Sequence, residues 1–327
     1  NRDHWNQAIL LEVDFELDRD SLDRALSALL DHHDALRLRW QQHDTQWRQE
    51  NAAPEPVEVL REVDLVLAED LEDEVRRVAQ QAQASLSLQD GPLLRAVWMR
   101  TAAELPDRLL LVAHHVAVDG VSWRILLEDL VEGYRGSLDR RPVELPAKTT
   151  SFQAWAARLR APELRAAVED EKEYWQHLPW AEVAELPVDS MGSNREEQSR
   201  TIEKGLSASE TSRLLHEAPR AYGTEIEDLL LCALGRVLTR WAGGEYVAVD
   251  VEGHGRSELA DDIDLTRTVG WFTTQFPVLL RSQVGSLADE IESTKEMLRA
   301  IPRGGFGFGL LREQGSVRSL PQPAIAF

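Results

Sequence analysis

The sequence is poor in cysteine and contains no long apolar run. Its single cysteine, Cys232, excludes an internal disulfide. The surrounding EDLLLCALGRVL places this thiol on the apolar face of a helix, so we expect a buried, inert side chain and not a nucleophile. No apolar run approaches the roughly 20 residues that span a bilayer. The start, NRDHWNQAIL, has no targeting pattern and indicates a segment of a longer chain, so a reducing cytoplasm is the expected location.

Positive charge is also scarce. Lys and Arg number 36 against 57 Asp and Glu, which gives a formal net charge of −21. Nucleic acids and anionic membranes bind positive surfaces, so this balance argues against both as general partners. The 327 residues, of which 43% are hydrophobic and 28% charged, are enough to bury a substantial core without disulfides.

The first half of the chain reads as alternating strands and helices. NQAILLEVDFEL is β-rich, and we expect the helix that follows to be N-capped by Ser21 and to end at His32 and His33, where such side chains suit a helix C-terminus. The predicted apolar stripe of this helix is Leu22, Ala25, Leu26, Leu29 and Leu30. GPLLRAVWMR and RLLLVAHHV then predict neighbouring strands, and VSWRILLEDLVEGYRG predicts a helix packed on the sheet.

The second half repeats this order of elements. Residues 151–178 are predicted to be helical but without a tight core pattern, and a loop at 185–199 precedes a predicted strand, RTIEKGL. Two helices and a strand, EYVAVDVEGHG, follow, whereas GGFGFG reads as a bend and lacks the ending of a phosphate-binding loop. The repetition predicts two related α/β lobes.

The stretch LLVAHHVAVDGVSWRILLEDL combines a strand, two histidines and a helix start. Side chains alternate along a strand, so His114 and His115 point in opposite directions, one into the fold and one toward a cleft. An imidazole in a cleft is suited to proton transfer near neutral pH. A plain pair of hydrogen-bonded histidines at a strand end is the alternative. A metal site built on His115 and Asp119 would need further ligands, and without a His-x-x-x-His or Cys-x-x-Cys pair we expect none.

Four stretches together resemble a known family. HHVAVDG fits the His-His-x-x-x-Asp-Gly motif of condensation-type domains in nonribosomal peptide synthetases, which are relatives of chloramphenicol acetyltransferase. VEGHGRSELADDIDLTRTVGWFTTQFPVLL, DGVSWRILLEDL and AIPRGGFGFGLLR resemble the epimerization branch of that family, with Phe308 in place of the usual Tyr. Ser257 stands where the branch often carries Glu. The family also continues past Phe327 into an Asn-Tyr-Leu-Gly segment, so the C-terminal lobe is expected to be incomplete.

The resemblance implies both a fold and a reaction. The fold would be α/β, with two chloramphenicol acetyltransferase-like lobes forming a V-shaped pseudo-dimer with a central tunnel. Residues 1–178 would carry the His-His motif, and residues 179–327 would carry Glu-Gly-His-Gly-Arg. The reaction would convert an L- to a D-configured aminoacyl or peptidyl thioester on the phosphopantetheine arm of a carrier protein, with no other cofactor. Such a domain would work beside neighbouring synthetase modules in antibiotic biosynthesis.

Inverting an α-carbon needs acid/base groups on opposite sides of the tunnel. We expect His115 to be one and Glu252 the other, with the pKa of Glu252 raised by partial desolvation at a strand end. The alternative for Glu252 is an ion pair with Arg256. The expected supporting residues are His114, Asp119, Gly120, Arg256 and Arg267, with an arginine pairing to Asp119. The residues expected near the substrate are Ser122, Trp123, His254, Trp271 and Phe272. The backbone N–H groups of Ser122 and Trp123 could stabilise an enolate oxygen.

Three other functions share parts of the pattern. A condensation domain would join two carrier-bound substrates, with His115 positioning the attacking amine. A non-catalytic docking module would keep the fold alone, and an unrelated metal hydrolase would need an ion. Because carrier proteins are usually acidic, binding one would require a local patch, for which Arg158, Arg160 and Arg165 are candidates.

Overall fold

The computed structural model describes residues 2–44, 46–190, 192, 195, 198–256, 262–281 and 285–327. Ser257, the departure from the epimerization pattern, lies outside this set. The chain forms two compact units. The first unit comprises Asn1–Arg158 and Arg256–Thr273, and the second comprises Leu159–Gly255 and Thr274–Phe327.

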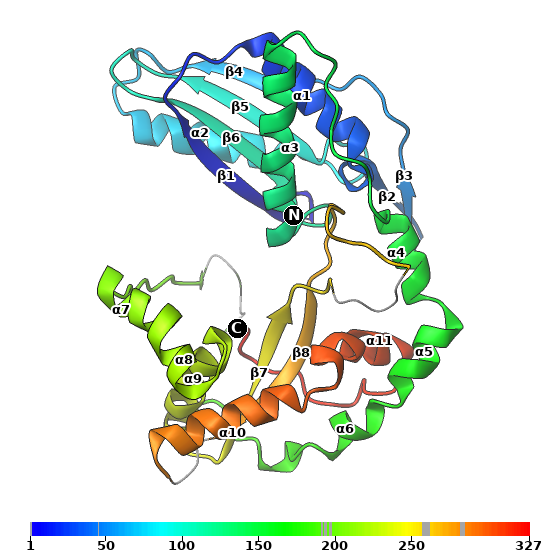
Figure 1. Cartoon of the computed structure of the whole chain (residues 1–327), viewed down its shortest axis with the longest axis vertical. Coiled ribbons are helices and arrows are strands. Elements are labelled where there is room, and N and C mark those ends of the chain that lie inside the picture. Colours follow the sequence, from blue (N-terminus) through cyan, green and yellow to red (C-terminus); the bar gives the residue numbers. More distant parts are fainter. Residues whose placement is uncertain are drawn as a thin grey trace. The chain divides into compact units, whose positions relative to one another are not determined.

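The first unit is built on a four-stranded sheet with the order β1-β6-β5-β4 (Figure 1). The strands are β1 (Asn6–Val13), β4 (Leu60–Asp64), β5 (Leu94–Arg100) and β6 (Asp107–His114). β6 lies antiparallel to both β1 and β5, and β4 runs parallel to β5. The pairing of β5 with β6 confirms the prediction that these two strands are neighbours.

Helices cover both faces of this sheet. α1 (Arg19–His32) and α3 (Gly120–Leu138) lie on one face, and α2 (Leu71–Gln83) lies on the other (Figure 1). Strand alternation explains the two layers, since Leu109 and Leu111 of β6 enter the core beneath α1 and α3 while Leu110 packs toward α2. Each fully buried leucine contributes about 1.5–3 kcal/mol of hydrophobic stabilisation.

The α1 prediction was right for its buried face and wrong for its cap. All five residues of the predicted stripe are buried. The N-cap, however, is Asp18, whose carboxylate accepts a hydrogen bond from the backbone N–H of Ser21. Ser21 therefore lies inside the first turn. The helix ends at His32, with His33 as the C-cap residue, whose backbone N–H donates to the Leu29 carbonyl.

The remaining described elements of the first unit are peripheral. They are a hairpin of β2 (Leu38–His43) and β3 (Gln46–Asn51), two 3-10 turns, η1 (Arg2–His4) and η2 (Asp34–Arg37), and α4 (Phe152–Leu159) at the boundary of the unit.

The second unit is organised around one antiparallel pair, β7 (Tyr246–Gly253) with β8 (Thr274–Arg281). Its longer helices are α9 (Ile226–Ala242), α10 (Leu287–Arg299) and α11 (Phe306–Gln314). Its shorter ones are α5 (Pro162–Glu169), α6 (Lys172–His177), η3 (Trp180–Glu182), α7 (Ala208–Ser212), the π-helical turn η5 (Arg213–Glu217), α8 (Ala218–Tyr222) and η6 (Pro302–Gly305). Cys232 is buried on α9, as predicted.

Three sequence predictions for this half were wrong. RTIEKGL forms no strand and is exposed, because no partner strand lies beside it in the described chain. The GGFGFG stretch enters a helix and does not form a simple bend, since Phe308 and Leu311 recur on the buried side of α11. The polar stretch 151–178 carries core residues, because Val168 and Trp175 are fully buried in the second unit.

The contact-based units differ from the predicted boundary at 178 in two places. The helices of 159–178 pack in the second unit, where the ring of Trp175 lies 4.9 Å from that of Phe308. Close packing also explains Gly307 in α11, because a Cβ there would lie 2.2 Å from the carboxylate of Glu171. Residues 256–273 connect β7 to β8 in sequence yet belong by contacts to the first unit.

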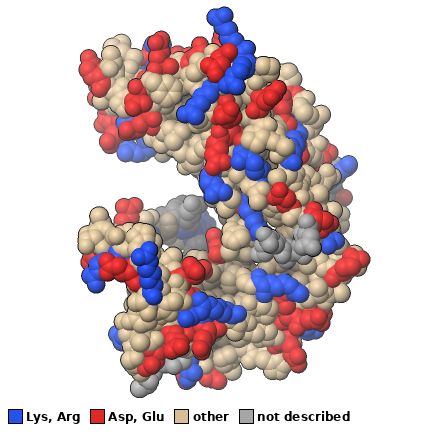
Figure 2. Space-filling model, viewed as in Figure 1, with Lys and Arg blue, Asp and Glu red and all other residues tan. Residues whose placement is uncertain are grey.

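Both signs of charge are dispersed over the face of the molecule that Figure 2 shows. Acidic and basic side chains alternate on the visible face (Figure 2). Several form ion pairs, such as Arg77 with Glu74 on α2. Within the described residues, no helix has the length and apolarity to cross a membrane.

Candidate active site in the first unit

His115 lies in the turn that joins β6 to α3. Its backbone N–H donates to the Trp5 carbonyl at 2.9 Å, and its ring Nδ1 lies 3.0 Å from the Val118 carbonyl oxygen. A carbonyl only accepts, so Nδ1 carries the proton and donates to it. The remaining nitrogen, Nε2, therefore keeps its lone pair. The ring is half-buried, and in this tautomer Nε2 is the nitrogen that can accept a hydrogen bond or a proton.

His114 is the other member of the motif and has a different environment. Its side chain is 1% exposed. Its Nε2 donates to the Arg2 carbonyl at 2.9 Å, while its Nδ1 accepts from the backbone N–H of Val116 at 3.2 Å. Burial lowers its pKa, which keeps the ring neutral. Both ring nitrogens are thus engaged in holding the turn.

Asp119 caps α3 and joins it to the segment 256–273. Its Oδ1 accepts from the backbone N–H and the hydroxyl of Ser122, at 2.7 and 2.8 Å. The same carboxylate accepts from Arg256 at 3.1 Å, and its Oδ2 accepts from the backbone N–H of Phe272. A carboxylate with this many donors is committed to scaffolding. Gly120, the first residue of α3, is exposed with open space around it, and nothing there requires glycine.

The enolate-binding role expected for the start of α3 is wrong. The backbone N–H of Ser122 is bonded to the Asp119 side chain, and that of Trp123 to the Asp119 carbonyl. The Ser122 hydroxyl is also occupied, because its one hydrogen can be donated to Asp119 or to the Gly270 carbonyl, and its oxygen accepts from the backbone N–H of Gly270. These N–H and O–H donors already bond within the start of α3 or to Gly270, so they are not available to an enolate oxygen.

Arg256 and Arg267 fasten the segment 256–273 to the first unit. Arg256 donates to the Leu265 and Thr268 carbonyls as well as to Asp119, and its guanidinium lies 4.1 Å over the ring of Phe272. Arg267 pairs with Glu128 at 3.1 Å and with Asp129 on α3. Both arginines thus make these contacts within one unit.

Tryptophans surround the His115 ring. Trp271 lies 4.6 Å from it, centroid to centroid, and Trp5 lies 6.3 Å away at a steep angle. The two indoles are 6.1 Å apart, and Trp271 is 39% exposed. These rings form an apolar wall open to solvent beside the base. Phe272, in contrast, is buried against Phe152.

Gln7, which belongs to none of the sequence motifs, contacts Nε2 of the His115 ring. The Gln7 side-chain nitrogen lies 3.2 Å from Nε2 of His115, and the Gln7 oxygen accepts from the indole N–H of Trp123 at 2.9 Å. Gln7 shares the inward face of β1 with Ile9, Leu11 and Val13. In the sequence, the signal for this contact is a polar residue, Gln7, at a position where the alternation of β1 predicts an apolar one.

The predicted residues of the second unit lie at the end of β7. Glu252 faces Gln275 across the β7–β8 pair, and its backbone N–H donates to the Phe327 carbonyl. Its side chain is exposed, so the expected partial desolvation is absent. Arg256, the alternative partner predicted for Glu252, bonds Asp119. His254 is also exposed. Because His115 and Glu252 belong to different units, their pairing stays a prediction.

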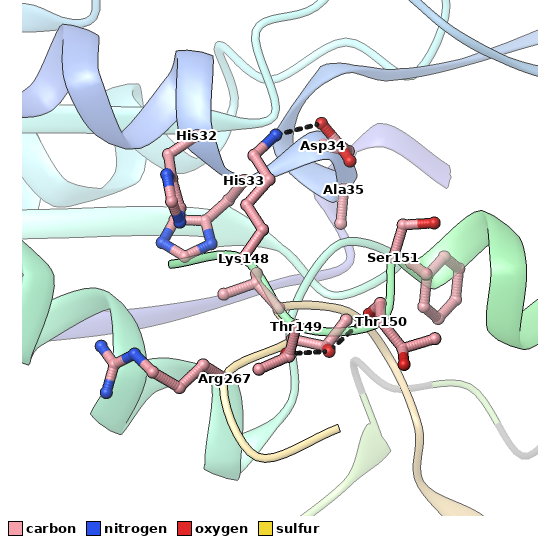
Figure 3. A pocket seen from close by; sticks show the side chains of 12 residues that line it. His32, His33, Asp34, Ala35, Lys148, Thr149, Thr150, Ser151 and Arg267 are labelled. Carbon is pink, nitrogen blue, oxygen red and sulfur yellow. Dashed lines mark hydrogen bonds and ion pairs between the residues drawn. The ribbon is translucent and has the colours of Figure 1, made fainter. Parts of the chain in front are cut away.

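A polar pocket of the first unit, lined by residues outside the His-His motif, lies where α1 ends (Figure 3). His32, His33, Lys148 and Arg267 line it, together with Thr149 and Thr268, whose hydroxyls are 2.9 Å apart. His33 donates through Nε2 to Asp129 at 2.9 Å, so the side chain expected to serve the helix end instead bonds α3.

His32, His33 and Asp129 offer ligand atoms within 4.8 Å of one another, the spacing of a metal site. The Asp129 carboxylate is, however, already shared by His33 and Arg267. Burial alone would raise its pKa, but the hydrogen bond from His33 and the charge of Arg267 lower it. We interpret the cluster as a buried hydrogen-bond network.

The fold and these motifs define a class of protein. A family described as Condensation domain matches residues 1–325, and the chain therefore belongs to the condensation-domain family. Chondramide synthase cmdD of Chondromyces crocatus is 41% identical over an alignment of 337 residues, which covers 99% of this chain but 8% of that protein. Tyrocidine synthase 1 of Brevibacillus parabrevis is 36% identical, over 100% of this chain and 31% of its own length. The chain thus spans a small part of these synthases.

Solved structures agree with this assignment. The epimerization domain from the third module of tyrocidine synthetase B is similar with a TM-score of 0.90 and 35% identity, over 100% of this chain and 76% of that one. The first condensation domain of the CDA synthetase, with a TM-score of 0.75 and 24% identity over 99% and 76%, shares the fold. The predicted α/β fold with two chloramphenicol acetyltransferase-like lobes is confirmed. The V-shaped arrangement and its tunnel stay predictions.

Proposed function

We propose that this domain epimerizes the α-carbon of an aminoacyl or peptidyl thioester carried on a phosphopantetheine arm. The observation that carries the proposal is the His115 ring, whose Nδ1 donates to the Val118 carbonyl, which leaves Nε2 as the nitrogen that can accept a proton, beside the ring of Trp271. The similarity to a solved epimerization domain, with 35% identity along the whole chain, supports the same branch.

The proposed reaction moves two protons. One base removes the α-hydrogen as a proton, and the electrons of the broken C–H bond delocalise into the thioester carbonyl as an enolate. An acid on the opposite face then protonates the carbon, which restores the carbonyl with inverted configuration. We assign the two roles to His115 and Glu252. After one turnover the base holds an extra proton and the acid has lost one, and exchange with water resets both.

The surroundings of His115 fit this task. The tryptophan wall excludes water from part of the ring and can stack on an imidazolium, which stabilises the cation formed when Nε2 accepts a proton. Asp119 and Arg256 hold the turn and the segment that bears Trp271. The phosphopantetheine arm serves as the substrate handle, delivered by a carrier protein that we propose as the partner.

For carrier binding, the structure weakens part of the candidate patch. Arg165 is paired with Glu313, and Arg158 lies 4.0 Å from Asp262. Arg160 is exposed. A docking role for these arginines would need the two ion pairs to open.

The test is a configuration assay on the intact protein with its own carrier domain. The L-configured aminoacyl or peptidyl thioester is loaded, released after incubation and resolved by chiral chromatography. We expect a mixture of L and D products from the wild type, and a rate lowered about 10²–10⁴-fold in His115→Ala and in Glu252→Gln. Recovery of the L form alone from the folded and loaded wild-type protein would refute the proposal.

A condensation domain is the second candidate, since the matching family includes that activity by name. Under this reading a second carrier-bound substrate yields a new peptide bond in the same assay. Glu252→Gln would leave bond formation largely intact, whereas it abolishes epimerization. The effect of Glu252→Gln on product formation therefore distinguishes the two functions.

A further inference from the structure

We propose that Gln7 is a positioning residue for His115, and that Trp123 fixes the orientation of its carboxamide. The inference rests on the proposed function, in which His115 transfers a proton through Nε2. Gln7 comes from β1, His115 from the β6–α3 turn and Trp123 from α3, so three elements of the first unit meet at the carboxamide of Gln7.

Donor and acceptor chemistry determines each link. An indole N–H can only donate, so the Gln7 atom 2.9 Å from Nε1 of Trp123 is the carboxamide oxygen. The Gln7 NH₂ group then faces His115, and because it can only donate, Nε2 of His115 must accept at 3.2 Å. The ring proton is left on Nδ1, where the Val118 carbonyl accepts it. The relay Trp123–Gln7–His115–Val118 permits one tautomer.

The relay also affects the protonated ring. The 3.2 Å contact is long for a hydrogen bond, so an approaching α-hydrogen can displace the amide. Once Nε2 holds the abstracted proton, that N–H faces the NH₂ group of Gln7, and two donors repel. Trp123 prevents an easy reversal of the amide by holding its oxygen. Gln7 thus orients the base and favours loss of the proton from the imidazolium to water, which resets the base for the next turnover.

Substitutions at Gln7 separate these effects. In Gln7→Glu, the carboxylate accepts a proton from Nε2 while the Val118 carbonyl still accepts from Nδ1, so the doubly protonated ring is favoured. We expect activity to fall about 100-fold, with the pH–rate profile moved to higher pH. In Gln7→Met the relay is removed without a charge, and a loss of about 10-fold is expected.

Trp123→Phe tests the orienting step. It frees the amide to turn its oxygen toward His115, and it should lower activity without adding to the loss in Gln7→Met, because both variants break the same relay. Gln49→Glu on β3 is the matched control, since it makes the same chemical change at an exposed position of the same unit.

The deciding measurement needs no turnover. The intact protein, labelled with ¹⁵N-histidine, is studied by NMR, and the His115 signals are identified by their loss in His115→Ala. We expect a protonated Nδ1 and an unprotonated Nε2 in the wild type and in Gln49→Glu, and protons on both nitrogens in Gln7→Glu. A protonated Nε2 in the neutral wild-type ring, or an unprotonated Nε2 in Gln7→Glu, would overturn the positioning role. The configuration assay fails independently if the proposed function is wrong, so the two failures are distinguishable.

Discussion

Asp119 and Arg256 stand 137 positions apart in the sequence and form an ion pair of 3.1 Å whose side chains are only 4% and 7% exposed. The pair lies directly behind the turn that carries His115. Burial lowers the pKa of Arg256 and the Asp119 charge opposes this effect, so each charge depends on the other. The His-x-x-x-Asp spacing thus couples the proposed base to a structural anchor.

Asp119→Asn should mainly destabilise the first unit. The substitution leaves Arg256 buried without its counter-charge and weakens the cap of α3, so we expect the free energy of unfolding to fall by about 3–5 kcal/mol. Urea denaturation measures this loss. Asp139→Asn, at the exposed opposite end of α3, should cost less than about 1 kcal/mol. Equal stabilities of the two variants would show that the buried pair is not an anchor.

Trp271→Ala should affect activity more than stability. The side chain is partly exposed and packs on His115, so its removal should cost about 1.5 kcal/mol or less of stability but should loosen the ring. We expect a lower kcat in the epimerization assay. Trp241→Ala, an exposed tryptophan on α9, is the control and should retain full kcat. A Trp271→Ala variant with wild-type kcat would contradict the wall as part of the site.

Acidification should weaken the fold through the buried His114 and the half-buried His32. Burial lowers the pKa of His114, and burial with the neighbouring His33 and Lys148 lowers that of His32, both from an ordinary value of 6.5. The unfolded chain therefore binds more protons as pH falls through that value, so stability is fully present above it and declines below it. Denaturation between about pH 8 and about pH 5 measures the slope.

Two substitutions assign that slope. His114→Asn should reduce it, because one of the protonation sites is gone, whereas His216→Asn at an exposed position of η5 should leave it unchanged. An unfolding free energy that stays constant or rises on acidification would exclude these histidines as its source.

The network at the end of α1 should contribute to stability through Asp129. Its side chain is 1% exposed and bonds both His33 and Arg267, so Asp129→Ala should cost about 3–5 kcal/mol. Glu128→Gln removes only the exposed partner of Arg267 and should cost less than about 1 kcal/mol. The lowered pKa of Asp129 adds a second decline, since the stability it provides above its unfolded value of 3.8 is lost as pH falls further.

Periodicity predicted the parts of the fold that depend on burial alone. The α1 stripe, the β5–β6 pairing and the buried Cys232 each follow from where apolar residues recur. Helix caps and short strands were harder to predict from the sequence. Asp18 and Ser21 are both good capping residues, and the choice between them depends on the geometry of the first turn. RTIEKGL has strand composition but no partner strand among the described residues.

Polar residues on apolar faces carried information that periodicity alone did not use. Gln7 interrupts the inward face of β1, and Asp129 interrupts the stripe of Ile125 and Leu126 on α3. Each marks a buried hydrogen-bond partner, but the partner itself comes from a distant element and is fixed only by tertiary packing. The motif therefore singled out His115 as a candidate site residue, whereas its contacts to Gln7 and Val118 could be found only in the structure.

The central claim is that His115 removes the α-proton of the carrier-bound substrate and that the carbon is then reprotonated on its opposite face. Mass spectrometry after incubation of the intact, loaded protein in deuterated water tests it most directly, because a reprotonated carbon acquires deuterium from solvent-exchanged acid groups. We predict incorporation of one deuterium at the α-carbon by the wild type and none above background by His115→Ala. Turnover without α-deuterium in the wild type, or undiminished exchange in His115→Ala, would contradict the account.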